Sequence, residues 1–267
     1  NTEQEVSRMK KVDLNCDLGE SFGNYKLGMD EQILPLITSA NIACGFHASD
    51  PVVMSRTVKM AAESGVAAGA HPGYQDLVGF GRRNMNVAPA EVTDIVMYQI
   101  GALEAFCRAN GIAMQHVKPH GAMYNMAEKD EKLAEAICQG IKAVNPDLIL
   151  LGPGSGKMVK AAKALGLKTA GEVFADRAYM EDGTLVPRSQ EGAMITDEEE
   201  AVARVLEMVQ KGTVTAITGK KIEVQADSIC VHGDGQKALL FVQKIRSELE
   251  KAGVVIAPMK EVIVGES

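Results

Sequence analysis

Seven short apolar segments, separated by helix-like segments, constrain the fold of this chain more than any other feature. Alternation of this kind is typical of βα units, which build a parallel sheet. The chain has 267 residues, a usual length for one α/β barrel. We therefore predict an α/β fold with a single seven-stranded (β/α) barrel over residues 9–267 and an N-terminal extension over residues 1–8. The predicted strands cover residues 10–15, 40–44, 66–70, 113–118, 147–151, 168–174 and 228–232.

Three of the intervening segments, residues 50–65, 88–111 and 196–212, carry clear helix signals. The first has Asp50 in the capping position, followed by proline, which is favoured at the first helical residue. The third begins with Thr196 and Glu199, which have the spacing of a capping box. These features predict scaffold helices and imply no chemistry.

Two segments interrupt the alternation and are predicted to be small β-hairpin additions to the barrel. Residues 178–188 contain an Asp-Gly pair at 182–183, a strong hairpin-turn signal, and residues 212–226 form a second short β segment. No low-complexity linker separates them from the rest of the chain, so we predict no domain boundary.

Composition excludes several classes of protein. The formal net charge of -7 argues against a general nucleic-acid-binding protein, which needs a basic face. No apolar run reaches the roughly 18 residues that a membrane helix requires, and the N-terminal residues lack the apolar segment of a secretory signal. The five cysteines form no C-x-x-C pair, which favours reduced thiols. A cytoplasmic enzyme is therefore expected.

Polar and ionisable residues concentrate just after the predicted strands. Because the carboxyl ends of barrel strands converge on one face, these residues are expected to share a site there. The alternative for any single histidine is a structural role, in which it bonds a loop carbonyl. The residues concerned are Asn15, Asp17, His47, Asp50, His71, Asp76, Lys118, His120, residues 154–157, Glu172, Asp176, Arg177, His232 and Asp234.

Residues 114–125 place His116, Lys118 and His120 at every second position. On a strand these side chains share one face, with Cα atoms about 6.5–7 Å apart. Two positive charges at about 7 Å repel by roughly 2.4 kcal/mol at an effective dielectric of about 20, so both histidines are expected to be neutral. A buried lysine needs a carboxylate partner, for which Asp17 or Glu172 is expected. Alternatively, the strand ends at Lys118, and His116 lies too deep to join the site.

The glycine-rich residues 152–157 suggest an anion site after the fifth strand. They do not form a phosphate-binding P-loop, because only three residues separate Gly152 from Gly156 and methionine follows Lys157. Gly154, Gly156 and Lys157 can still bind a phosphate or carboxylate at a helix N-terminus. The alternative is an ordinary tight turn between strand and helix.

Arginines after the strands predict that the ligand is a small anion. Arg82 lies in the glycine-punctuated segment 71–86, and Arg177 follows the sixth strand. Guanidinium groups on such loops can hold a carboxylate, although most loop arginines are solvated.

A divalent metal is a further option. Imidazole and carboxylate groups could supply its ligands, but none has a local metal-binding spacing, so no metal ligands are assigned. Cys16 and Cys44 adjoin the site and are expected to be small buried residues. The residues considered as metal ligands are Asp17, His47, His71, His120 and His232.

Five motifs resemble those of the LamB/YcsF family, whose members form the A subunit of bacterial 5-oxoprolinases. They are VDLNCDLGESFG, ANIACGFHASDP, GAHPGYQDLVGFGRRNM, VKPHGAMYN and FADRAYMEDGTLVPR, and the resemblance covers the chain from Met9 onward. It implies a seven-stranded barrel of the glycoside hydrolase/deacetylase type. It also implies ATP-dependent opening of the 5-oxoproline lactam to L-glutamate, with two partner subunits similar to those of allophanate hydrolase.

We assign roles from the residues themselves. Asp17, His71 or His120 is expected to act as the general base, and Lys118 to stabilise negative charge on oxygen. Two other functions remain open: a metal-dependent amide or sugar deacetylase, and a non-catalytic subunit that binds 5-oxoproline. The residues expected to bind substrate are Asn15, His47, Arg82, Glu172, Arg177 and His232.

Overall fold

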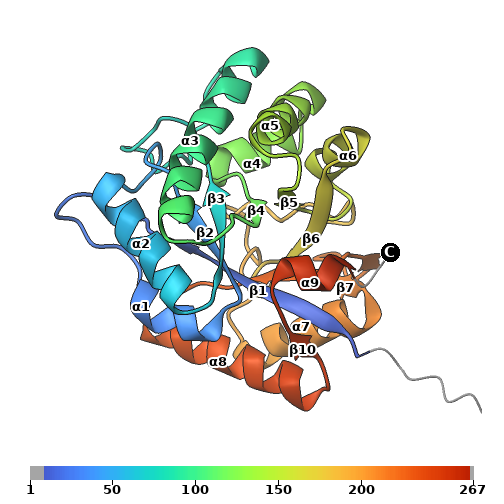
Figure 1. Ribbon diagram of the computed structural model, residues 1–267. Coiled ribbons are helices and arrows are strands. Elements are labelled where there is room, and N and C mark those ends of the chain that lie inside the picture. Colours follow the sequence, from blue (N-terminus) through green and yellow to red (C-terminus); the bar gives the residue numbers. More distant parts are fainter. Residues whose placement is uncertain (1–8, 265–267) are drawn as a thin grey trace, which may run out of the picture.

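The computed structural model of the protein describes residues 9–264, in which seven parallel strands form a closed barrel surrounded by helices (Figure 1). β1 closes the barrel because it pairs with β2 on one side and β9 on the other. The predicted seven-stranded barrel is therefore confirmed, whereas the predicted extension over residues 1–8 lies outside the described residues. The barrel strands are β1 (Lys11–Leu18), β2 (Ser39–Ala43), β3 (Ala67–His71), β4 (His116–Val117), β5 (Ile149–Gly152), β6 (Lys168–Phe174) and β9 (Ser228–Cys230).

The fourth strand is shorter than predicted, with only two residues in regular pairing. The chain still follows β3 on both sides, because Gln115 N–H donates to Ala68 O at 2.7 Å and Lys118 N–H donates to Ala70 O at 2.9 Å. Pro119 cannot donate a backbone hydrogen bond, but beyond it His120 N–H donates to Pro72 O at 2.8 Å.

The longer helices lie around the outside of the barrel, as Figure 1 shows. Asp50 caps α2 as predicted, since its carboxylate accepts from Val52 N and Val53 N. The predicted start of α7 is wrong by one residue, because Asp197 rather than Thr196 is the N-cap and accepts from Glu200 N. The helices are α1 (Asp30–Ile33), the 3-10 turn η1 (Leu34–Leu36), α2 (Pro51–Glu63), α3 (Pro89–Ala109), α4 (Gly121–Ala127), α5 (Glu131–Val144), α6 (Lys157–Ala164), α7 (Glu198–Lys211), α8 (Gln236–Lys251) and α9 (Met259–Ile263).

Both predicted hairpins are present. In the first, Met180 N–H donates to Thr184 O at 2.7 Å across the turn. The second consists of the antiparallel strands β7 (Thr213–Thr215) and β8 (Lys221–Glu223). None of the helices within residues 9–264 is both long and apolar enough to cross a membrane.

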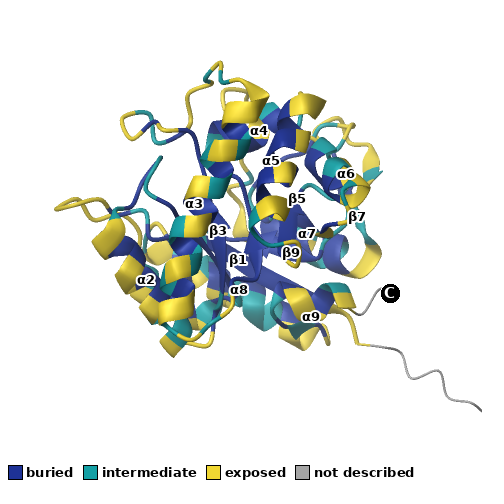
Figure 2. Cartoon of the chain, turned by 45° about the horizontal axis from the view of Figure 1, so that its top comes forward, coloured by how far each residue is buried: buried dark blue, intermediate teal, exposed yellow. Residues whose placement is uncertain are grey.

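The inside of the barrel is polar. Along β1, Asp13, Asn15 and Asp17 alternate with the buried residues Val12 and Leu14, which belong to the main hydrophobic core. Figure 2 shows the barrel strands as largely buried, and the buried residues of β1 include the polar Asp13 and Asn15. Barrel interiors are usually filled by bulky branched residues, so this interior depends on hydrogen bonds to an unusual degree.

The C-terminal segment closes the end of the barrel opposite the strands' carboxyl ends. The short strand β10 (Val255–Ile256) pairs with the start of β1. In α9, Met259 packs against Ile149, Leu151 and Ala170 in a cluster separate from the main core. Within residues 9–264, this leaves the end formed by the strands' carboxyl termini for a site built from barrel loops.

Candidate active site

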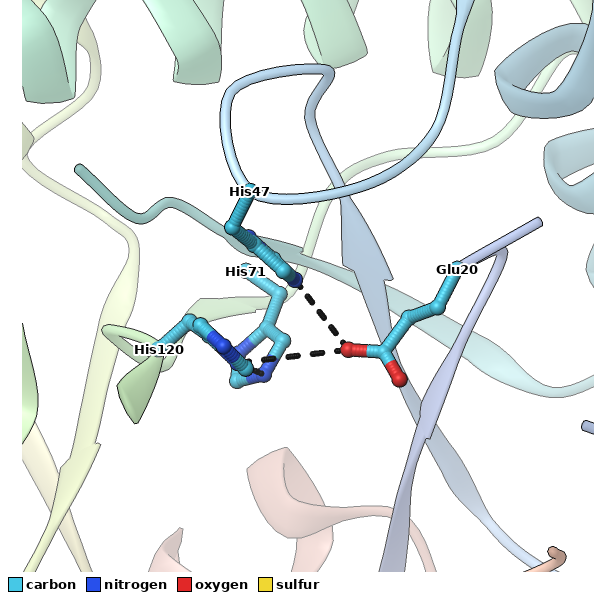
Figure 3. A group of neighbouring side chains, drawn as sticks. All are labelled: Glu20, His47, His71 and His120. Carbon is cyan, nitrogen blue, oxygen red and sulfur yellow. Dashed lines mark hydrogen bonds and ion pairs between the residues drawn. The ribbon is translucent and has the colours of Figure 1, made fainter. Parts of the chain in front are cut away.

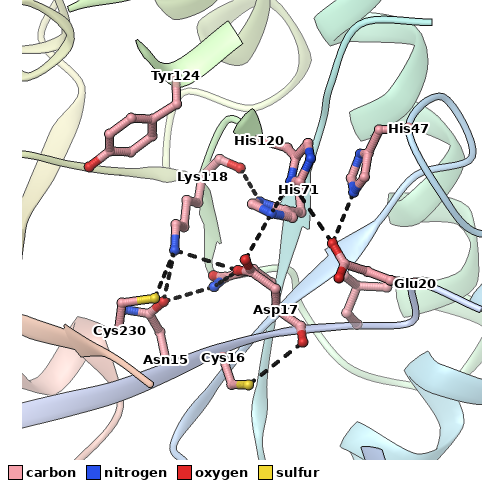
Figure 4. A network of polar contacts seen from close by, with 12 residues as sticks. Asn15, Cys16, Asp17, Glu20, His47, His71, Lys118, His120, Tyr124 and Cys230 are labelled. Carbon is pink, nitrogen blue, oxygen red and sulfur yellow. Dashed lines mark hydrogen bonds and ion pairs between the residues drawn. The ribbon is translucent and has the colours of Figure 1, made fainter. Parts of the chain in front are cut away.

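Lys118 lies at the carboxyl-terminal mouth of the barrel among polar side chains from other strands (Figure 4). Its Nζ lies 2.7 Å from Glu172 Oε2, 3.5 Å from Asp17 Oδ1 and 3.3 Å from Asn15 Oδ1. Burial lowers the pKa of this ammonium, but the opposing charges of Asp17 and Glu172 outweigh burial and hold the pKa well above its ordinary value. The expectation of a carboxylate partner is confirmed for both candidates, so Lys118 is a buried amine that lies between two carboxylates.

Asn15 lies below this lysine, and its polar atoms bond within the protein. Its Nδ2 donates to Ser228 Oγ at 2.7 Å, while its Oδ1 accepts from Asn41 Nδ2 at 2.8 Å and from Lys118. The amide therefore orients Lys118, and a direct contact with substrate would require it to give up one of these partners.

His116 lies deeper in the barrel than the other histidines. Its Nε2 lies 2.7 Å from Asn41 Oδ1, and its Nδ1 lies 3.2 Å from the side-chain nitrogen of Gln115. Burial, and secondarily the charge of Lys118, lowers the pKa of His116 to about 3. The structure thus agrees with the alternative in which His116 belongs to the barrel interior.

His47, His71 and His120 meet beside Asp17 and are joined by Glu20 from the loop after β1 (Figure 3). The His47 and His120 rings stack with centroids 3.6 Å apart, and the His71 ring stands edge-on to His120 at 4.8 Å. Glu20 Oε1 lies 3.1 Å from His47 Nε2. One ligand atom from each of these four residues lies within 4.8 Å of the other three, so the group can hold a metal ion.

Backbone carbonyls orient two of these rings. His71 Nδ1 lies 2.7 Å from Lys118 O, and His120 Nε2 lies 2.7 Å from Phe80 O. The remaining nitrogens, His71 Nε2 and His120 Nδ1, face each other at 3.0 Å. Phe80 has a positive φ of 53°, which is rare for a residue other than glycine and places strain at this loop.

Burial dominates the electrostatics of the histidine group. It lowers the pKa of His120 to about 3 and, together with repulsion from Asp17, raises that of Glu20 to about 8. His71 differs, because the Asp17 carboxylate 3.3 Å away outweighs burial and raises its pKa. His120 was expected to be neutral, and its lowered pKa agrees with that expectation. The main cause is burial and not the charge of Lys118.

The other expected substrate-binding residues lie on surrounding loops. Arg82 is exposed, with its guanidinium 5.0 Å from the centroid of the Phe80 ring. Arg177 is buried and donates from Nη2 to Val186 O at 2.8 Å, which ties it to the first hairpin. His232 pairs with Asp176 rather than with the other histidines, at 3.3 Å.

The glycine-rich turn before α6 already holds a carboxylate from the same chain. Glu128 accepts from Lys157 N at 2.9 Å and from Met158 N at 3.2 Å. A Cβ atom on Gly156 would overlap this carboxylate, and a Cβ on Gly154 would come within 2.5 Å of Gln225. An added phosphate would have to displace Glu128, and the anion site on Gly154, Gly156 and Lys157 stays a prediction.

A cavity of about 270 Å³ adjoins Glu172 over the ends of β5 and β6. Its walls include Gly154, Tyr179 and Gln225. On the barrel side of Glu172, the Tyr124 hydroxyl donates to Oε1 at 3.1 Å. Glu172 therefore lies between the buried Lys118 and space that can admit a small molecule.

Glu20 is the site residue that the sequence analysis missed. It lies three residues after Asp17, beyond Gly19, whose φ of 69° turns the chain at the end of β1. Glu20 could have been predicted as a site residue, because it belongs to the polar residues that follow β1. Cys16 and Cys44 are buried as expected, and burial raises the pKa of both thiols.

Comparisons with known proteins cover almost the full chain. The model of the LamB/YcsF family matches residues 12–264. A Clostridium beijerinckii protein, named as the A subunit of a 5-oxoprolinase, is 65% identical over 254 residues, which are 95% of this chain and 100% of that protein. A Pyrococcus abyssi protein of the same name is 55% identical over 95% of this chain and 99% of its own length.

A solved structure agrees with these sequence matches. The crystal structure of the lactam utilization protein from Thermus thermophilus has a TM-score of 0.88 to this chain at 46% identity, covering 92% of this chain and 99% of that one. Family model, relatives and structure thus agree over nearly the whole length, and the chain belongs to the LamB/YcsF family.

Proposed function

We propose that this chain is the A subunit of a 5-oxoprolinase and opens the lactam of 5-oxoproline to give L-glutamate. The observation that carries this proposal is its 65% identity, over the full length of the relative, to a protein named as the A subunit of such an enzyme. The buried ion pair of Lys118 and Glu172 at the barrel mouth supplies a charged site for such a reaction.

The reaction is proposed to be coupled to ATP, because a five-membered lactam is a stable amide and a poor electrophile. Transfer of the γ-phosphoryl group to the lactam oxygen makes the ring carbon open to attack by water. Water adds to that carbon and the ring C–N bond breaks, with the nitrogen taking up a proton, which leaves an acyl phosphate. A second water hydrolyses the acyl phosphate to the carboxylate and phosphate. In the net reaction, 5-oxoproline, ATP and two waters give L-glutamate, ADP and phosphate.

Asp17 is the proposed general base, oriented by His71. The Asp17 carboxylate is partly exposed and lies 3.3 Å from His71 Nε2. Burial opposes its ionisation, but the charges of His71 and Lys118 outweigh burial and hold its pKa well below the ordinary value. Lys118 is proposed to stabilise negative charge that develops on the lactam oxygen.

Arg82 is the proposed partner of the substrate carboxylate. It is exposed on the loop between β3 and α3, which also carries Phe80 above the histidine rings. Arg177 is a weaker candidate, because its guanidinium is buried and bonded to the first hairpin.

ATP binding and assembly belong to the same proposal. We place the chain in a cytoplasmic complex with two further subunits that resemble those of allophanate hydrolase. The relatives are named as one subunit of their enzyme, which supports a multi-subunit assembly. Glu128 occupies the backbone N–H of Lys157, and its negative charge would repel a phosphate at Gly154, Gly156 and Lys157. We therefore propose that ATP binds to one of the partner subunits.

The test is 5-oxoproline-dependent ATP hydrolysis by the chain reconstituted with both partner subunits. Lys118→Ala should lower kcat by roughly 100-fold or more, because a buried charge at the reacting oxygen is lost. Lys59→Ala removes a lysine from the exposed face of α2 and should leave kcat unchanged. Unchanged turnover in Lys118→Ala would reject this catalytic role.

The histidine group favours a second candidate, a metal-dependent amide hydrolase. Such an enzyme would release product from an amide without ATP and would lose activity with a chelator. Running the same assay without ATP, with and without chelator, separates the two functions. Lactam binding without turnover in any arm would instead indicate a non-catalytic binding subunit.

A further inference from the structure

We infer that Glu20, His47, His71 and His120 form a binding site for one divalent transition-metal ion. The four side chains come from four separate loops or strand ends and converge on one point (Figure 3). Their ligand atoms lie 3.0 Å apart for His71 and His120, 3.1 Å for Glu20 and His47, and 3.9 Å for Glu20 and His120. Ligands about 2.1 Å from a tetrahedral ion lie about 3.4 Å from one another, close to these separations.

The orientation of two rings supports a metal more strongly than their proximity does. His71 Nδ1 donates to Lys118 O and His120 Nε2 donates to Phe80 O, each at 2.7 Å. Metal-ligating histidines typically donate their other ring nitrogen to a carbonyl or carboxylate in this way. The backbone therefore fixes which nitrogen of each ring points inward.

The inward nitrogens then need a positive charge between them. With the outer nitrogens protonated, His71 Nε2 and His120 Nδ1 present lone pairs to each other at 3.0 Å. A proton on His71 Nε2 would be shared between His120 Nδ1 and Asp17 Oδ2, which lies 3.3 Å from the same nitrogen. A metal ion would also satisfy Glu20 Oε1, which points into the same group.

The loop that carries Phe80 has a strained backbone, and this backbone places the carbonyl that orients the His120 ring. Phe80 adopts a left-handed φ of 53°, which directs its carbonyl to His120. At the next residue, Gly81, a Cβ atom would lie 2.7 Å from His47 Cβ and 2.9 Å from His120 Cδ2. Strain of this kind persists where surrounding structure imposes it, and it concentrates at ligand sites.

The donor set indicates the kind of metal. Three imidazole nitrogens and one carboxylate oxygen suit zinc, iron, cobalt or nickel better than magnesium or calcium, which prefer oxygen ligands. The Glu20 side chain is 15% exposed, so an ion can enter from the barrel mouth. Zinc and cobalt(II) are therefore the probes for this site.

The test uses the full purified chain without partners, ATP or lactam. After treatment with a chelator, Zn²⁺ is titrated by calorimetry, and Co²⁺ is titrated by its visible absorption. One equivalent should bind, and His47→Gln and Glu20→Gln should each weaken affinity at least tenfold, because each loses a ligand. Glu63→Gln is the control, since that carboxylate pairs with Lys59 on the exposed face of α2, and it should bind like wild type.

Folding of each variant is checked by thermal unfolding, in which the ion should raise the Tm of wild type and Glu63→Gln but not of His47→Gln. No binding by wild type, or equal binding by His47→Gln and wild type, would overturn the inference. Because neither lactam nor ATP is present, failure of the proposed 5-oxoprolinase function would leave the result unaffected.

Discussion

Lys118 Nζ lies 2.7 Å from Glu172 Oε2, and both side chains are almost completely buried. Removing one partner of a buried pair leaves an uncompensated charge, so Glu172→Gln should lower the free energy of unfolding by roughly 3 kcal/mol. Asp17 remains near the ammonium and limits the loss. The measurement is urea denaturation followed by circular dichroism.

An exposed ion pair provides the control for this substitution. Lys59 and Glu63 on α2 form an i,i+4 pair with both side chains about two-thirds exposed. Glu63→Gln should change the free energy of unfolding by less than about 0.5 kcal/mol. Equal effects from the two substitutions would show that Glu172 is not the principal partner of Lys118.

Asp13 should make stability depend on pH. Burial, only partly offset by bonds from Ser228, Ser39 and Thr38, raises its pKa from 3.8 to about 6. Between about pH 4 and pH 6 the unfolded chain loses the proton while the folded chain retains it. The contribution of Asp13 to the free energy of unfolding is therefore fully present below about pH 4 and falls by up to roughly 3 kcal/mol as the pH rises through 6.

Asp13→Asn isolates this dependence, because its side chain stays neutral across the range. Denaturant unfolding at intervals between pH 4 and pH 7 should show a shallower decline for the variant than for wild type. Parallel profiles for the two proteins would contradict the raised pKa.

Gly69 should not tolerate a side chain. A Cβ atom there would overlap the His116 ring, which is buried and held by Asn41. Gly69→Ala should therefore cost about 2–3 kcal/mol of stability. Gly101→Ala, on an exposed part of α3 with open space around the added atom, should instead stabilise by roughly 0.5–1 kcal/mol. Comparing the two Tm values tests the packing of His116, and a stabilised Gly69→Ala would refute it.

The start of α7 can be tested with two neighbouring substitutions. Asp197 accepts from Glu200 N at 2.8 Å, so Asp197→Ala should cost about 1 kcal/mol. Thr196→Ala should cost much less, because Thr196 lies outside the cap. Both losses are measured by denaturant unfolding. A larger loss for Thr196→Ala than for Asp197→Ala would show that Thr196 is the cap, as the sequence predicts.

Local patterns were sufficient to predict the barrel. The short apolar segments between helix-like segments indicate the seven strands, and the Asp50-Pro51 start of α2 depends on backbone chemistry within a few residues. Helix boundaries are harder to predict where two neighbouring residues can both serve as the N-cap. At α7, the aspartate and not the preceding threonine makes the cap.

The partners of Lys118 were predicted because a buried charge is costly wherever it lies. That argument predicts Asp17 or Glu172 as the partner of Lys118, and both carboxylates lie within 3.5 Å of its Nζ. It did not identify Glu20, whose position depends on the path of the loop after β1. Nor did it reveal that Asn15 bonds Ser228, because contacts between distant strands depend on how the barrel closes.

The polar interior links stability and activity in the same side chains. Ser228 donates to Asp13 at 2.5 Å and accepts from Asn15 at 2.7 Å, and Asn15 in turn accepts from Lys118. One chain of contacts therefore connects the closed end of the barrel to the proposed reaction centre. A substitution of Lys118 at the mouth therefore leaves Asn15 without one partner, and compensating for it requires further substitutions at Ser228 or Asp13.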